Sequence, residues 1–158
     1  MKSRIAFLLA LSVGIPAGFA MAQESATSNM DILRQKIKSD KKLLVAENMG
    51  LTDAEGKAFW PIYDAYQADL QKINGRLKKV IEAYAEAYNK GAVPNETAKK
   101  LINEAVAIDE AEAALKRSYL PKLEKALPMA KVARYLQIEN KIRALVRYEL
   151  AAEIPLVD

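Results

Sequence analysis

Apolar residues recur at helical spacing along residues 29–152, and glycine and proline fall at only a few positions between them. The most regular stretch is 52–90, where apolar side chains repeat every seven residues in two registers. The registers are Tyr63, Leu70, Leu77 and Tyr84, and Phe59, Tyr66, Ile73 and Val80. Such spacing is typical of a long helix packed lengthwise against partners, here about 58 Å long. The pattern therefore predicts an elongated all-α bundle.

Cap signals indicate where the first two helices end and begin. A first helix is expected over about residues 29–48, with Gly50 ending it. The second helix is expected to follow Leu51. There the Thr52 hydroxyl can accept from the backbone N–H of Glu55, while the Glu55 carboxylate accepts from the backbone N–H of Thr52. This capping box fixes the helix start, and Gly91 ends the helix.

Two further helices follow in the sequence. The third is expected over about residues 94–126, with Asn95 as its cap, and the fourth over about residues 127–152. Leu127 and Pro128 open the fourth helix, because proline is well placed in a first turn.

Prolines and a short extended segment complete the expected fold. Pro61 and Pro121 fall inside predicted helices, where each removes one backbone hydrogen bond and bends the axis. The alternative is that each proline marks a helix start after a short break. Residues 154–157 are expected to be extended. The fold predicted is an antiparallel bundle of about four helices with long, kinked central helices.

Residues 1–22 are typical of a secretory signal peptide. Basic residues precede an apolar run over 5–15, and an Ala-x-Ala cleavage site ends at Ala22. A retained membrane anchor is the alternative, but it needs roughly 20 uninterrupted apolar residues, and Pro16 interrupts the run. We therefore expect export to the periplasm, cleavage after Ala22 and one helical domain over 23–158 without stable membrane insertion.

Composition narrows the function classes. The chain has no Cys and no His, so it lacks disulfides, the commonest zinc ligand and the usual general base near neutral pH. Without the predicted signal peptide it carries 22 basic and 20 acidic residues, which gives no argument for nucleic acid as a partner. No nucleophile stands in a recognisable motif beside a base. We expect a non-enzymatic protein with no catalytic residues, metal or cofactor.

Four aromatic side chains lie within residues 59–66. Phe59, Tyr63 and Tyr66 are predicted to face the core, whereas Trp60 lies at the edge of the apolar stripe and is expected to be half exposed. The functional alternative makes this group a surface that binds apolar segments of other proteins. A dimer contact is a third possibility, because thin helices have difficulty burying so many rings.

Acidic residues are concentrated in part of the third predicted helix, and basic residues are concentrated in the fourth. The acidic group is Glu104, Asp109, Glu110 and Glu112; the basic group is Lys131, Arg134, Lys141, Arg143 and Arg147. One interpretation is attraction across an antiparallel helix pair. The other is a basic strip of Arg134, Lys141, Arg143 and Arg147 that attracts acidic or unfolded clients. Asp109 and Glu112 share a helix face, but no loop of oxygen ligands accompanies them to form a cation site.

The signal peptide, the all-helical build and the helix start at Leu51, Thr52 and Glu55 resemble the Spy/CpxP family, whose members carry Leu-Thr-x-x-Gln at helix starts. Glu55 replaces the family's Gln, and Leu127 with Pro128 stands where a second, here degenerate, copy is expected. The resemblance implies a curved antiparallel dimer whose concave side holds unfolded clients without ATP, or which damps an envelope-stress sensor. Relatives that sense metals use ligands that include His, which this chain lacks.

One enzyme class also has this length and an all-helical build. Exported chorismate mutases begin their first helix with a Leu-Arg pair, and Leu33, Arg34 and Ile37 are similar, but Lys38 and Asp40 depart from the pattern. The preferred hypothesis is a periplasmic homodimer that binds unfolded or partner envelope proteins as a chaperone or stress adaptor. The alternative is a regulatory subunit with one dedicated partner, such as a sensor kinase or anti-sigma factor.

Overall fold

The computed structural model describes residues 40–157, and residues from Lys41 onward form one compact unit. Residues 41–49 are helical and are followed by α2 (Asp53–Asn89), α3 (Asn95–Ala126) and α4 (Met129–Glu153). The described residues form no strand. The all-α prediction is therefore confirmed, whereas the predicted signal peptide lies outside the described residues.

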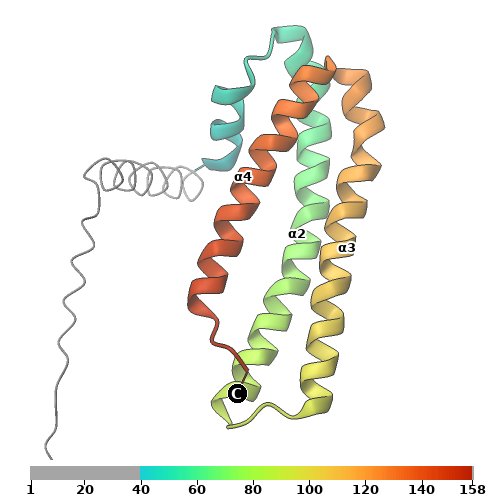
Figure 1. Ribbon diagram of the computed structural model, residues 1–158. Coiled ribbons are helices and arrows are strands. Elements are labelled where there is room, and N and C mark those ends of the chain that lie inside the picture. The colour runs from blue at the N-terminus through green and yellow to red at the C-terminus, as the bar shows by residue number, and fades with distance from the viewer. Residues whose placement is uncertain (1–39, 158) are drawn as a thin grey trace, which may run out of the picture. The chain divides into compact units, whose positions relative to one another are not determined.

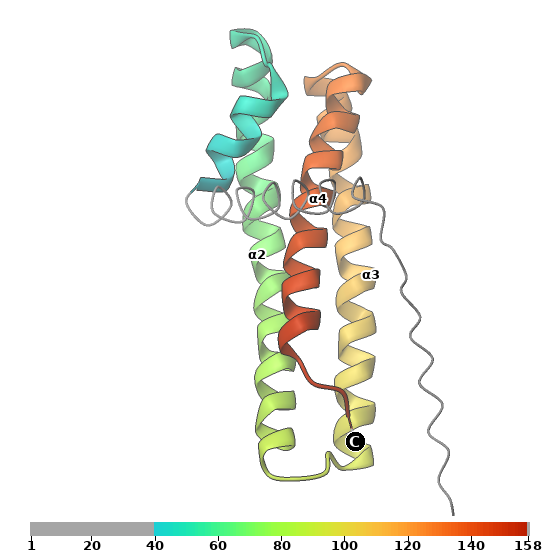
Figure 2. The same ribbon diagram turned by 60° about the vertical axis from the view of Figure 1, so that its left-hand side comes forward.

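The long helices lie side by side. In Figure 1, α2 and α3 run antiparallel and are joined at one end by a short connection, while α4 returns alongside them. The view turned by 60° shows α4 flanking both partners (Figure 2). The helical residues 41–49 lie beside only the end of the bundle where α2 begins.

The capping box confirms the predicted start of α2. The backbone N–H of Glu55 donates to Thr52 Oγ1 over 3.3 Å, and the backbone N–H of Thr52 donates to Glu55 Oε2 over 2.8 Å. The preceding helix ends at Gly50, whose φ of 55° is left-handed and favours glycine. These local signals place the connection between residues 49 and 53 as the sequence predicts.

Two other helix starts differ from the prediction. Asn95 is not a cap, because it is already the first helical residue and Pro94 holds the cap position with φ −61° and ψ 141°. Pro128 likewise precedes α4 and does not belong to its first turn. The φ fixed by each proline ring suits the extended cap conformation. The first backbone bond of each helix therefore goes to a proline carbonyl, from Ala98 over 2.9 Å and from Val132 over 3.1 Å.

The interior prolines do not interrupt their helices. Pro61 lies within α2 and Pro121 within α3, and both helices continue past them. The alternative that each proline begins a helix is wrong. The ends of α3 and α4, at Ala126 and Glu153, match the sequence prediction to within a residue.

Aromatic rings form the core near the start of α2. Phe59, Tyr63 and Tyr66 are at most 3 % exposed and face Tyr119 and Tyr135 from the other two long helices. The rings of Phe59 and Tyr135 meet edge to face with centroids 5.0 Å apart, and Tyr66 meets Tyr119 in the same way at 5.3 Å. Such pairs stabilise a core beyond the area they bury. The prediction that three of the four neighbouring rings are core residues is confirmed.

The seven-residue repeat is buried along only part of α2. Its early members are in the core, but the later members Leu70, Leu77, Val80 and Tyr84 are only half-buried. The difference arises because the helical residues 41–49 cover the first part of the bundle alone. Among the described residues no helix is long and apolar enough to cross a membrane.

Removing the Thr52 cap is expected to destabilise the fold. Thr52→Ala should lower the free energy of unfolding by about 1 kcal/mol, because a backbone N–H at the start of α2 loses its acceptor. Urea denaturation of the purified chain measures this change.

Asn95→Ala is the matched control, since Asn95 holds no cap in the structure. Its stability should stay within about 0.5 kcal/mol of the unaltered chain. Equal losses from both substitutions would contradict the assigned caps.

Candidate functional site

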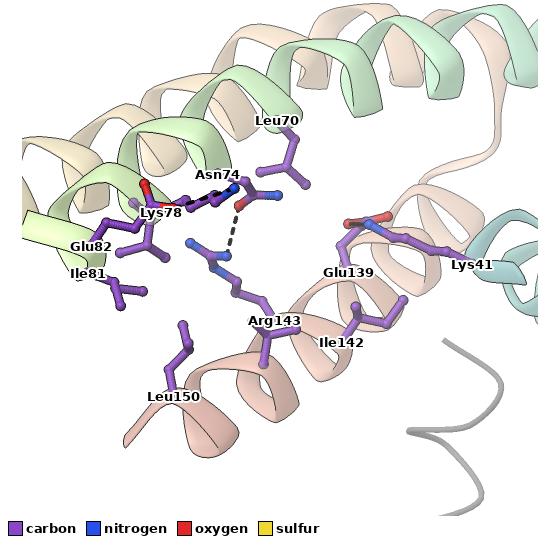
Figure 3. Close-up of a pocket in the computed structure, with 12 residues that line it drawn as sticks. Lys41, Leu70, Asn74, Lys78, Ile81, Glu82, Glu139, Ile142, Arg143 and Leu150 are labelled. Carbon is purple, nitrogen blue, oxygen red and sulfur yellow. Dashed lines mark hydrogen bonds and ion pairs between the residues drawn. The ribbon is translucent and has the colours of Figure 1, made fainter. Parts of the chain in front are cut away.

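An apolar groove separates α2 from α4 in the part of the bundle that the helical residues 41–49 leave uncovered (Figure 3). Its volume is about 540 Å³. Six aliphatic side chains line it: Leu70, Leu77 and Ile81 from α2, and Ile142, Val146 and Leu150 from α4. We call this the α2–α4 groove.

The groove exists because α2 and α4 do not approach each other closely. No Cα of α4 lies within 8 Å of a Cα of α2, although α3 makes such close contacts with both helices. Helices in direct contact have axes about 8–10 Å apart, so side chains must span a wider gap here. Long polar side chains bridge it at two points.

The first bridge is a buried cluster around Glu139, which is 4 % exposed. Lys41 Nζ donates to Glu139 Oε2 over 2.8 Å, and Gln67 Nε2 donates to Glu139 Oε1 over 2.9 Å. Gln67 also accepts from Lys41 over 2.8 Å and donates to the Tyr135 hydroxyl over 3.3 Å. A carboxylate buried to this degree needs such partners, and here they come from residues 41–49 and α2. The cluster closes one end of the groove.

The second bridge is Arg143 of α4, whose side chain is 15 % exposed. Its guanidinium donates to Asn74 Oδ1 of α2 over 3.0 Å and from Nε to Glu112 Oε2 of α3 over 3.0 Å, and forms a second ion-pair contact with Glu112. Arg143 thereby joins all three long helices. Burial, and secondly the nearby Arg147, lowers the pKa of Arg143 from its usual value.

Every charge that lines the α2–α4 groove has an opposite charge beside it. Lys41 pairs with Glu139 and Arg143 with Glu112, while Lys78 Nζ lies 3.5 Å from Glu82 Oε1 at the rim. Figure 3 shows the charged lining residues around the aliphatic walls: Lys41, Lys78, Glu82, Glu139 and Arg143. The groove therefore offers apolar surface without an uncompensated charge.

The predicted basic strip is divided between two faces of α4. At 100° per residue, Lys141 and Arg143 point about 160° apart around the helix axis. Arg143 and Arg147 contact the acidic residues of α3, with Arg147 bonded to Asp109 and lying 3.3 Å from Glu112. For Arg143 and Arg147, these contacts agree with the first interpretation of the charge pattern, which is attraction across an antiparallel helix pair.

The other two residues of the strip are exposed. Within the described part of the chain, Arg134 and Lys141 have no ion-pair partner. Their role in attracting clients stays a prediction, but they do not share a surface with Arg143.

Asp109 and Glu112, considered from the sequence as a cation site, are instead partners of arginines. No group of three or more acidic side chains within residues 40–157 is arranged to hold a metal ion.

Trp60 differs from its aromatic neighbours as the sequence predicts. It is half-buried against the core, with its ring centroid 5.0 Å from that of Phe59 and 5.4 Å from Lys42 Nζ. Leu70, the first groove residue of α2, lies ten positions further along the helix, which corresponds to about 15 Å. The aromatic cluster and the groove are thus separate features.

The residues of the cap motif serve the core. Leu127 is 4 % exposed and belongs to the core cluster, and Leu51 packs against the same cluster. Glu55 also accepts from Lys131 Nζ over 2.5 Å, so the start of α2 is tied to the first turn of α4. This bond is the main cause that lowers the pKa of Glu55, and the capping bond with Thr52 lowers it further.

Sequence reasoning did not find the α2–α4 groove, although it named Leu70, Leu77 and Arg143 as helix residues. Their apolar spacing was visible, but the open space depends on where residues 41–49 pack and on which side chains bridge α2 and α4. No family model, curated protein or solved structure matches the chain.

Removing one partner of the buried Arg143 pair is expected to be costly. Glu112→Gln should lower the free energy of unfolding by about 3 kcal/mol, because it leaves the Arg143 guanidinium poorly compensated in a buried position. Urea denaturation again supplies the measurement.

Glu110→Gln removes an exposed carboxylate two residues away and serves as the control. It should change stability by less than about 0.5 kcal/mol. The assigned bridge is contradicted if Glu112→Gln is as mild as the control.

Alkaline pH should destabilise the fold through Tyr66. Burial, and secondly the charge of Glu139, raises the pKa of Tyr66 from 10.0 to about 12. The folded state therefore favours the neutral phenol, so this contribution is complete below the unfolded pKa near 10 and is lost as pH rises towards 12. Unfolding measured across this window should show a decline that Tyr66→Phe reduces.

The exposed Tyr148 provides the matched comparison, since Tyr148→Phe removes a phenol that the core does not hold. An absorbance titration should lose a phenolate step well above pH 10 in Tyr66→Phe. Loss of a step at pH 10 instead would contradict the burial of this hydroxyl.

Proposed function

We propose that this protein acts by binding other proteins, and that the α2–α4 groove holds an aliphatic segment of an unfolded client. The observation that carries the proposal is the row of six aliphatic side chains along an open groove of about 540 Å³. Pockets of this size and lining suit apolar ligands. The protein would bind and release the client without making or breaking a covalent bond.

Charge pairing supports a neutral aliphatic occupant. Because the charged residues at the groove are already paired, a charged ligand segment would lose water and gain no free partner there. An aliphatic segment would instead bury apolar surface on both sides, at roughly 25 cal/mol per Å². The groove therefore selects for hydrophobicity and not for a particular charge.

Unfolded envelope proteins expose the segments that such a groove would hold. Exported to the periplasm, the protein would act as a chaperone in stoichiometric amounts. The proposed binding and release of clients uses no ATP. The resemblance of the Thr52 helix start to the Spy/CpxP family favours the same role. The homodimer and the periplasmic location stay predictions.

The test compares two isoleucines in helices. Ile81→Gln places an amide in the groove, whereas Ile102→Gln makes the same change on the exposed face of α3, where Ile102 is 60 % exposed. Purified variants are mixed with an unfolding client at equal molar ratio without nucleotide, and aggregation is followed by light scattering. Ile81→Gln should weaken client binding roughly tenfold, since it exchanges apolar burial for an unpaired polar group. Ile102→Gln should leave it unchanged.

Trp60→Ala locates the site independently. If Trp60→Ala abolishes suppression while Ile81→Gln does not, clients bind at the aromatic cluster and the groove assignment is wrong. If the unaltered protein protects none of several clients, the chaperone role is wrong. Affinity capture that returns one envelope protein, with Ile81→Gln abolishing capture, would favour the regulatory alternative at the same groove.

A further inference from the structure

A charged hollow lies on the other flank of α4, between α4 and α3. The two helices run side by side (Figure 2), and the hollow between them has a volume of about 470 Å³. Six of the eight side chains that line it are charged. They are Asp109, Glu112, Lys116 and Arg117 of α3, and Arg143 and Arg147 of α4. We call this space the α3–α4 hollow.

Positive charge exceeds negative charge in the α3–α4 hollow. Four basic side chains line it against two acidic ones, which leaves an excess of two positive charges. Both carboxylates pair with the arginines of α4. Among the described residues Lys116 forms no ion pair, and Arg117 forms neither an ion pair nor a hydrogen bond. The excess charge therefore lies at the two basic residues of α3.

Several N–H donors around the hollow are unused within residues 40–157. Arg147 reaches its two acidic partners through Nη2 alone, so Nε and Nη1 keep free N–H groups. Lys116 Nζ donates to Asn140 Oδ1 over 2.8 Å, which uses one of its three donors. Arg117 uses none of its five. Donors from both helices are thus available to a ligand in the hollow.

A small side chain leaves room beside these donors. Ala113 lines the hollow and is exposed, and it precedes Lys116 by three positions and Arg117 by four. Residues at these spacings share one face of a helix. The long basic side chains of α3 therefore border a space that only a methyl group enters from their own helix.

The arginines of α4 repel each other across this space. Burial, and secondly the charge of Arg147, lowers the pKa of Arg143, although Asp109 and Glu112 lie between α3 and α4 to compensate both arginines. A concave surface with charge of one sign in excess concentrates its electrostatic potential. An anion in the hollow would relieve this repulsion.

The excess charge and the donor geometry favour a phosphate group over a carboxylate. A phosphate monoester carries a charge of about −1.5 to −2 at pH 7, which matches the excess, whereas a carboxylate carries only one negative charge. Guanidinium groups bind phosphate through two parallel N–H bonds, and an ammonium group adds a compact charge. The hollow supplies both kinds of donor.

We propose that the α3–α4 hollow is a binding site for a phosphate group, which Lys116, Arg117 and Arg147 hold through their unused donors. The inference goes beyond the proposed function, because it concerns the other flank of α4 and requires no client protein. Free inorganic phosphate and the headgroup of a phospholipid are the two sources of such a group. Both present the same oxygens to the hollow.

The experiment titrates inorganic phosphate into the full chain by isothermal titration calorimetry at low ionic strength, because salt screens exposed charges. The unaltered chain should bind with a dissociation constant of about 1 mM or lower. Arg117→Gln should weaken binding about tenfold, since it removes one excess charge and an unused guanidinium. Arg134→Gln removes an exposed, unpaired arginine outside the hollow and is the matched control. It should change the affinity by less than about twofold.

A second pair of variants tests the hollow without removing a basic residue. Ala113→Glu places a carboxylate in the hollow four positions before Arg117 and should abolish phosphate binding. Ala133→Glu adds the same charge at an exposed position of α4 outside the hollow and should leave binding unchanged. Circular dichroism checks that each variant remains helical.

Vesicles identify the source of the phosphate group. The chain is sedimented with phosphatidylcholine vesicles that contain phosphatidic acid, whose headgroup is a phosphate monoester, or that lack it. Binding that requires phosphatidic acid, and that Arg117→Gln weakens, supports the hollow as a headgroup site. Binding of inorganic phosphate without vesicle binding supports it as a site for the free ion.

Three results would overturn the inference. The first is no phosphate binding up to about 20 mM. The second is an equal loss of affinity in Arg117→Gln and Arg134→Gln, and the third is binding of a blocked tetraglutamate peptide where phosphate does not bind. Ile81→Gln should weaken client protection and leave phosphate affinity unchanged. A chain that binds phosphate but protects no client would therefore contradict the chaperone role alone.

Discussion

The packing of α4 depends on buried charges that must find partners on the neighbouring helices. Glu139 and Arg143 lie one turn apart on α4, and each is almost removed from water. Glu139 is compensated by Lys41 and Gln67, and Arg143 by Glu112 and Asn74. Sliding or rotating α4 would leave both uncompensated at once. The two clusters therefore determine where α4 lies relative to α2 and α3.

The same clusters keep α2 and α4 apart. Side chains as long as Lys41, Gln67 and Arg143 span a gap that close apolar packing would not leave, and the aliphatic walls between them remain open. Near the start of α2 the aromatic core and residues 41–49 fill the space. Farther along, residues 154–156 line a second hollow of about 430 Å³ that stays open. The bundle thus combines a packed end with an end that has apolar surface available for a ligand.

Local features of this fold were predictable and long-range ones were not. Thr52 and Glu55 lie three residues apart, so their reciprocal bonds could be read from the sequence, as could the turn at Gly50. Asn95 was misjudged because proline and asparagine compete for the cap, and the sequence shows no clear winner between them. The sequence predicted that the basic residues of the fourth helix face the acidic group of the third, but not which acidic residue pairs with Arg143. That the partner is Glu112 depends on how the two helices are rotated about their axes. The groove depends on all these contacts together, which explains why periodicity alone did not reveal it.

The most direct test of the account is to observe which methyl groups a client touches. Methyl resonances of isoleucine, leucine and valine are recorded by NMR on the full chain before and after an unfolded client is added. The account predicts that Ile81, Val146 and Leu150 shift, while Ile102 and Val106 on the exposed face of α3 do not. Shifts confined to Ile102 and Val106, with the groove residues unchanged, would contradict it.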